Sequence, residues 1–112
     1  ITVTAVDSNK MAYQTTNIPL TAGQEIWLEV DYKSDVPFWV GYQGHYPGST
    51  VVSTNQVLFV NARSSWNKLY VKLSESVAAS LASTYSIYFE ALRPYGSNGG
   101  TVYIDNVKLL TL

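Results

Sequence analysis

Apolar and polar residues alternate along several short stretches of the chain, most clearly from Glu25 to Lys33. A period of two is typical of a β-strand that buries one face and leaves the other accessible. The pattern therefore predicts a strand with an apolar inner face and an outer face that mixes rings and charges. The inner set is Ile26, Leu28, Val30 and Tyr32, and the outer set is Trp27, Glu29, Asp31 and Lys33.

Similar short runs recur through the chain, separated by residues that favour turns. They predict further strands at Ile1 to Val6, Met11 to Leu20, Phe38 to Tyr42, Gln56 to Asn61, Trp66 to Leu73, Tyr85 to Arg93 and Val102 to Leu109. Gly41 to Thr54, with three glycines and Pro47, is predicted as a loop or an irregular hairpin, and Ser74 to Ser83 is the only helix candidate. Seven or eight short strands and little helix predict an all-β fold, a two-sheet antiparallel β-sandwich formed by a single domain over residues 1–112.

The composition of the chain argues against several classes of function. With 112 residues the chain can bury a core without help, and with no cysteine it has neither disulfides nor a thiolate nucleophile. A net charge of -1 argues against nucleic acid as a partner. No run approaches the about 18 apolar residues of a membrane span, and no signal peptide is visible. Because the sequence begins at Ile1 without Met, we expect that it has been trimmed.

Three segments carry a resemblance to a known family. They are Tyr88-Phe89-Glu90, the sequence Tyr103-Ile104-Asp105-Asn106-Val107 after a glycine-rich loop, and the strand that begins Trp66-Asn67-Lys68-Leu69-Tyr70. Together they resemble the β-jelly-roll carbohydrate-binding modules attached to xylanases, within the galactose-binding-like superfamily, and also small surface lipoproteins of Bacteroidota. The resemblance extends from about Gln24 to Leu109 and implies a jelly-roll sandwich.

A carbohydrate site is the first functional hypothesis. Sugars stack their C–H faces on aromatic rings, while acids and amides bind the hydroxyls. In the resembling modules the acid of a Tyr-aromatic-Glu strand faces the ligand cleft, and Glu90 occupies that position. To the candidates for this site, the alternation of the strands adds further rings and acids that are predicted to face outward. The alternative to a sugar site is that these rings pack against loops or other subunits. The candidate carbohydrate-binding residues are Trp27, Glu29, Trp39, Tyr70, Tyr88 and Glu90.

Loop aromatic residues form a second set of candidates. His45, Tyr46 and Tyr95 are expected to form a rim around the site, because loops often carry function. The alternative for the first two is that Gly44 to Gly48 is only a tight turn.

Asp105 is the one candidate metal ligand. In the resembling modules the acid of a Tyr-Ile-Asp strand often binds a structural calcium with oxygens from the N-terminal segment. Here the usual Asn-x-Phe-Glu opening is missing, so the partner carboxylate is missing too. The alternative is that Asp105 accepts backbone N–H bonds across a β-bulge. No cofactor is required for either function considered below.

Catalysis is not predicted. The chain has one histidine and contains neither a Gly-x-Ser-x-Gly nor a His-Glu-x-x-His motif. We therefore expect a non-catalytic, extracellular carbohydrate-binding module, secreted or at the cell surface, that holds a polysaccharide or oligosaccharide on an aromatic sheet face. The alternative is a structural or adhesive surface domain whose rings contact copies of itself or other surface proteins, for instance in a filament.

Overall fold

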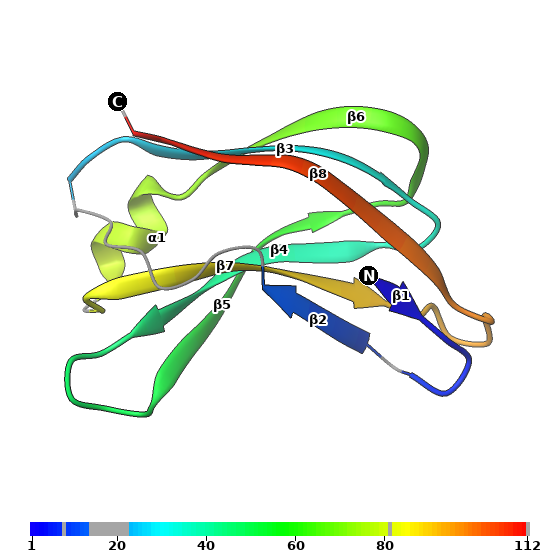
Figure 1. Ribbon diagram of the computed structural model, residues 1–112, viewed down its shortest axis with the longest axis horizontal. Coiled ribbons are helices and arrows are strands. Elements are labelled where there is room, and N and C mark those ends of the chain that lie inside the picture. Colours follow the sequence, from blue (N-terminus) through cyan, green and yellow to red (C-terminus); the bar gives the residue numbers. More distant parts are fainter. Residues whose placement is uncertain (8, 14–22, 81, 112) are drawn as a thin grey trace.

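The computed structural model describes residues 1–7, 9–13, 23–80 and 82–111, with the backbone alone for 9–13. In this part of the chain two four-stranded antiparallel sheets pack face to face (Figure 1), which confirms the predicted β-sandwich. The first sheet has the strand order β1-β8-β3-β6 and the second has β2-β7-β4-β5. The strands are β1 (Thr2–Val3), β2 (Asn9–Tyr13), β3 (Ile26–Ser34), β4 (Phe38–His45), β5 (Val52–Val60), β6 (Arg63–Lys72), β7 (Thr84–Leu92) and β8 (Gly100–Thr111).

The core lies between the sheets and follows the period-two alternation of the sequence. In β3 every second side chain from Ile26 to Ser34 is buried and those between are partly exposed, as predicted. From the second sheet, β4 and β7 contribute Phe38, Val40 and Phe89, whose side chains are completely buried. The ring of Phe38 meets those of Tyr32 and Phe89 at centroid distances of 5.4 and 6.4 Å and so ties the two sheets together.

From Gly41 to Thr54 the chain forms an irregular hairpin, which is one of the two predicted alternatives, whereas a loop over the whole stretch is wrong. Strand β4 continues to His45 and β5 begins at Val52, so only residues 46–51 connect them. Gly41 lies within β4 because neighbouring groups leave no room for a side chain at this position. A Cβ on Gly41 would collide with the carbonyl oxygen of Asn55 and the ring of Tyr88.

The helix candidate is confirmed in part, as the six-residue helix α1 (Ser74–Ala79). It lies at one end of the sandwich (Figure 1), and the buried Val77 anchors it to the core. Within the expected strand from Met11 to Leu20, β2 ends at Tyr13, and positions 14–20 lie outside the described residues. Among the described residues, no helix is long and apolar enough to cross a membrane.

Strand β8 contains an irregularity that the sequence indicated. Its register against β3 shifts between Glu29 and Asp31, and Asn106 has a positive φ of 51°. Asn tolerates this left-handed conformation better than most residues, so a bulge forms here. The bulge turns the side chain of Asn106 toward β3, where it meets Asp31.

Candidate functional site

The six candidate carbohydrate-binding residues do not form one site. Trp27, Glu29 and Tyr70 project from the outer face of the first sheet, where β3 pairs with β6. The other three, Trp39, Tyr88 and Glu90, project from the outer face of the second sheet, where β4 pairs with β7. Because the two sheets bury their inner faces against each other, these groups lie on opposite sides of the molecule, and the prediction of a single site is wrong.

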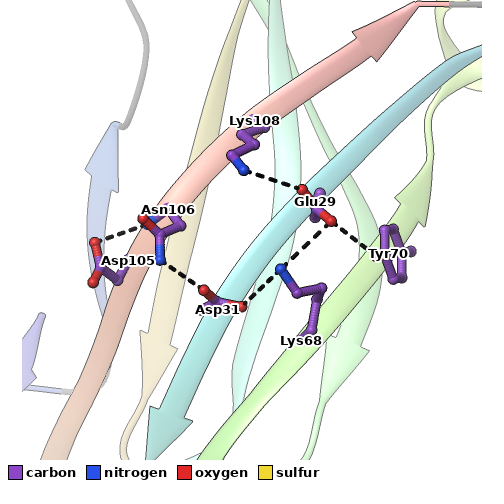
Figure 2. A network of polar contacts seen from close by, with 7 residues as sticks. All are labelled: Glu29, Asp31, Lys68, Tyr70, Asp105, Asn106 and Lys108. Atoms are coloured by element: carbon purple, nitrogen blue, oxygen red, sulfur yellow. Dashed lines mark hydrogen bonds and ion pairs between the residues drawn. The ribbon is translucent and has the colours of Figure 1, made fainter.

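The outer face of the first sheet carries a continuous polar network, shown in Figure 2. We call this surface the network face. Its central residues come from β3, β6 and β8, which lie side by side. They are Glu29, Asp31, Lys68, Tyr70, Asp105, Asn106 and Lys108.

Glu29 is one of two acids at the centre of the network. It accepts a hydrogen bond from the Tyr70 hydroxyl at 2.8 Å. Its carboxylate also lies 3.5 Å from the Lys68 ammonium and 3.8 Å from that of Lys108. The hydrogen bond from Tyr70 is the main cause that lowers the pKa of Glu29 below its usual 4.5, and the two lysines add to it against the opposing effect of burial.

Asp31 is the second acid. Its carboxylate accepts a hydrogen bond from Asn106 Nδ2 at 2.8 Å and lies 3.5 Å from the Lys68 ammonium. The bond from Asn106 is the largest cause that lowers the pKa of Asp31. Burial lowers the pKa of Lys68, but the charges of Asp31 and Glu29 outweigh it and raise the pKa overall. The network is therefore held in its charged form, with its acids fixed in place.

Aromatic rings flank this network on the same face. Trp66 is 51% exposed, Tyr70 53% and Tyr103 45%. The Lys33 ammonium lies 5.5 Å from the ring centroid of Trp66 and 4.8 Å from that of Tyr103, so it contacts both rings. At the other end of β3, Trp27 is partly buried.

The outer face of the second sheet, which we call the Glu90 face, is much less accessible. Tyr88 is completely buried and Glu90 is only 7% exposed, although both side chains point away from the core. Gln56 Nε2 lies 3.4 Å from a carboxylate oxygen of Glu90. Trp39 packs edge-on against Phe59 with centroids 5.3 Å apart. The expectation that Tyr88 and Glu90 are open to a ligand is not met, because parity predicts the direction of a side chain and not what covers it.

The three rim candidates do not gather around one opening. His45 pairs with Thr84 at the start of β7, whereas Tyr95 follows the end of this strand. A nine-residue strand spans roughly 25 Å, so the predicted common rim is wrong. Tyr95 is fully exposed, and Tyr46 lines a pocket beside α1.

His45 has a contact that sequence reasoning missed. Its Nε2 lies 2.7 Å from the hydroxyl oxygen of Ser86. Ser86 is only 5% exposed, so this hydroxyl is not presented to a substrate. The contact ties β4 to β7.

Asp105 is exposed, and its carboxylate accepts a hydrogen bond from the backbone N–H of Asn106 at 2.8 Å. This is the backbone contact at a bulge that the second alternative predicts. Among the described residues no three His, Cys, Asp or Glu side chains gather as a metal site would require. The described residues thus place no cluster of three such side chains at Asp105, and the structural calcium stays a prediction.

Several residues of the network face were not among the sequence candidates. Trp66, Lys68 and Tyr103 share it because β6 and β8 both pair with β3. Trp66 could have been predicted, because it lies four residues before Tyr70 on the same strand and an alternating strand places both side chains on one face. Tyr103 could not be predicted in this way, because the bulge at Asn106 shifts the register between this residue and the end of β8.

Comparisons with known proteins bear on the fold. No family model and no curated protein matches the sequence. A solved structure titled "CBM4 structure and function", a carbohydrate-binding module, is similar with a TM-score of 0.53 and 14% sequence identity, over 93% of this chain and 73% of that one. At this identity the likeness concerns the fold. The chain thus shares the β-sandwich fold of that structure, and this fold is the one that the sequence resemblance predicted.

Proposed function

We propose that the protein is a non-catalytic, extracellular carbohydrate-binding module that holds a polysaccharide on its network face. The observation that carries this proposal is the presence of three exposed rings, Trp66, Tyr70 and Tyr103, beside fixed carboxylates on one sheet face. Rings of this kind stack on the apolar face of a sugar. Carboxylate and amide groups next to them accept and donate the hydrogen bonds that sugar hydroxyls need.

The arrangement of the polar groups supports the proposal. Glu29 and Asp31 are held by partners on both neighbouring strands, so little side-chain freedom is lost when a ligand binds. Their outward neighbours on β3 continue in the same line from Trp27 to Lys33, over about 20 Å. An elongated surface of this length suits an extended chain of sugars. The likeness of the fold to a solved carbohydrate-binding module agrees with this assignment.

Affinity electrophoresis of the isolated domain tests the proposal. Native gels that contain soluble xylan, mixed-linkage glucan or galactomannan are compared with a gel without polysaccharide. We expect at least one glycan to retard the wild-type protein. Trp66→Ala is expected to weaken the binding about tenfold or more, because the loss of an aromatic ring that anchors a ligand costs that much.

The matched control is Phe59→Ala, which removes a ring of similar exposure from the Glu90 face. This variant is expected to bind as the wild type does. If no glycan retards the wild-type protein, or if Phe59→Ala abolishes binding and Trp66→Ala does not, the proposal fails. The first of these outcomes would favour the structural or adhesive alternative, in which the exposed rings contact protein.

A further inference from the structure

A pocket of about 520 Å³ lies at the end of the sandwich that carries α1, away from the network face. Tyr42, Tyr46, Ser53 and Asn55 line it from β4, β5 and the connection between them. Ser76, Ala79 and Ser80 line it from the helix and its C-terminal end. We propose that this pocket is a second binding site, for a small uncharged polyhydroxylated ligand such as a single sugar residue.

The chemistry of the walls defines the class of ligand. None of the lining residues carries a charge; they offer hydroxyls, one amide and two aromatic rings. Hydroxyl groups both donate and accept, as the hydroxyls of a sugar do, whereas an anion or a cation would find no opposite charge. The volume lies within the roughly 300–1,000 Å³ of small-molecule sites.

Specific contacts hold the walls of the pocket. The Tyr42 hydroxyl donates to the carbonyl oxygen of Ser76 at 3.1 Å and so joins the strand wall to the helix wall. Tyr85 packs edge-on against Tyr42 at 5.7 Å, and its hydroxyl donates to the carbonyl of Ala82 at 3.3 Å. These bonds fix both walls before a ligand arrives, which lowers the entropic cost of binding.

Two further features shape the strand wall of the pocket. At Gly44 a Cβ would come within 2.9 Å of Ser53 Oγ and 2.8 Å of Ala82 Cβ, so the glycine lets the strand and the segment after α1 approach closely. Asn55 donates from Nδ2 to Ser53 Oγ at 3.3 Å. The other polar atom of this side chain, the amide oxygen, is an acceptor of the kind that a ligand hydroxyl needs.

Nuclear magnetic resonance titration with methyl glycosides of glucose, galactose, mannose and xylose tests the proposal. A ligand of this size is expected to bind with a dissociation constant on the order of 1 mM. At least one glycoside should shift the side-chain amide resonance of Asn55 and the backbone resonances of Ser53 and Ser80. Glucuronate, which carries a carboxylate, should shift them less.

A matched pair of variants locates the binding. Ala78 and Ala79 are both exposed neighbours on the same helix, but only Ala79 lines the pocket. Ala79→Trp is expected to abolish the shifts by filling the pocket, and Ala78→Trp is expected to preserve them. If no glycoside shifts these resonances in the wild-type protein, or if the shifts persist in Ala79→Trp, the proposal is overturned.

The test of the pocket can be distinguished from the test of polysaccharide binding on the network face. Ala79→Trp should leave retardation by a polysaccharide unchanged, and Trp66→Ala should leave the glycoside shifts unchanged. Shifts confined to the resonances of Trp66 and Tyr103 would overturn the pocket site and support only the sheet-face proposal.

Discussion

At the scale of single residues, Glu29 shows how the network face is held. Its carboxylate accepts a hydrogen bond from the Tyr70 hydroxyl and forms ion pairs with two lysine ammonium groups. The side chain of Glu29 is only 14% exposed. The same hydrogen bond raises the pKa of Tyr70, because ionisation of the phenol would place two negative charges side by side. Tyr70 thus has two roles, as a hydrogen-bond donor through its hydroxyl and as an exposed ring.

Tyr70→Phe separates these roles and gives a testable prediction. The ring remains, but the main cause of the lowered pKa of Glu29 is lost, so this pKa should rise toward 4.5. A carboxyl whose folded-state pKa is lowered stabilises the protein above its unfolded pKa, and the contribution disappears as the pH falls through the folded value. Tyr70→Phe should therefore lower the free energy of unfolding near neutral pH and have a smaller effect at a pH where Glu29 is protonated.

Carboxyl chemical shifts followed against pH measure this change directly. Asn106→Gly is the control, because it removes the donor to Asp31 and leaves the Tyr70 hydroxyl in place. It should raise the pKa of Asp31 and leave the pKa of Glu29 near its wild-type value. An unchanged pKa of Glu29 in Tyr70→Phe would contradict the role assigned to this bond.

At the scale of elements, the bulge in β8 decides which side chains share the network face. Asp31 pairs with Asp105, and between this pair and the next one β8 has two residues, Asn106 and Val107, where β3 has only Val30; the positive φ of Asn106 accommodates the extra residue. Beyond the bulge the register continues with Lys108 opposite Glu29. One backbone irregularity therefore brings Asn106 into the network.

Substitution of Asn106 tests the bulge. Asn106→Val places a β-branched side chain in the left-handed region, and we expect it to lower the free energy of unfolding by about 1–2 kcal/mol from backbone strain alone. Asn106→Gly loses the same side-chain bond without this strain and should be less destabilised. Chemical denaturation of both variants measures the difference, and equal stabilities would show that the backbone here is not strained.

At the scale of the whole molecule, the two outer faces are separate surfaces on opposite sides of the core. Sheets in a sandwich lie about 10 Å apart, so Trp27 on one face and Trp39 on the other cannot touch. Trp39 does touch Phe59, at 5.3 Å between ring centroids. A double-mutant cycle measures the coupling free energy between two side chains, and it therefore distinguishes the separated pair from the contacting pair.

We expect the effects of Trp27→Ala and Trp39→Ala on the free energy of unfolding to add within about 0.5 kcal/mol. For Trp39→Ala and Phe59→Ala we expect a coupling of about 0.5–1.5 kcal/mol, because the ring contact is lost only once. Urea unfolding of the single and double variants provides the values. A strong coupling between Trp27 and Trp39 would contradict their placement on opposite sides.

The sequence by itself determined the fold class and the direction of most side chains in the clear strands. Along β3 the alternation is local, since successive side chains of an extended backbone must point to opposite faces. It therefore predicted which residues from Ile26 to Lys33 are buried. The possibility of a bulge near Asp105 was also visible, because an acid interrupts an apolar run there.

Only the tertiary structure decided which strands share a sheet, and with it which outward residues share a surface. Trp27 and Glu90 both point outward, yet β3 and β7 belong to different sheets. Strand order is set by pairing between segments far apart in the chain, such as β2 with β7, and no local pattern encodes it. The pocket beside α1 has the same origin, because its walls meet only when the helix packs at the end of the sandwich.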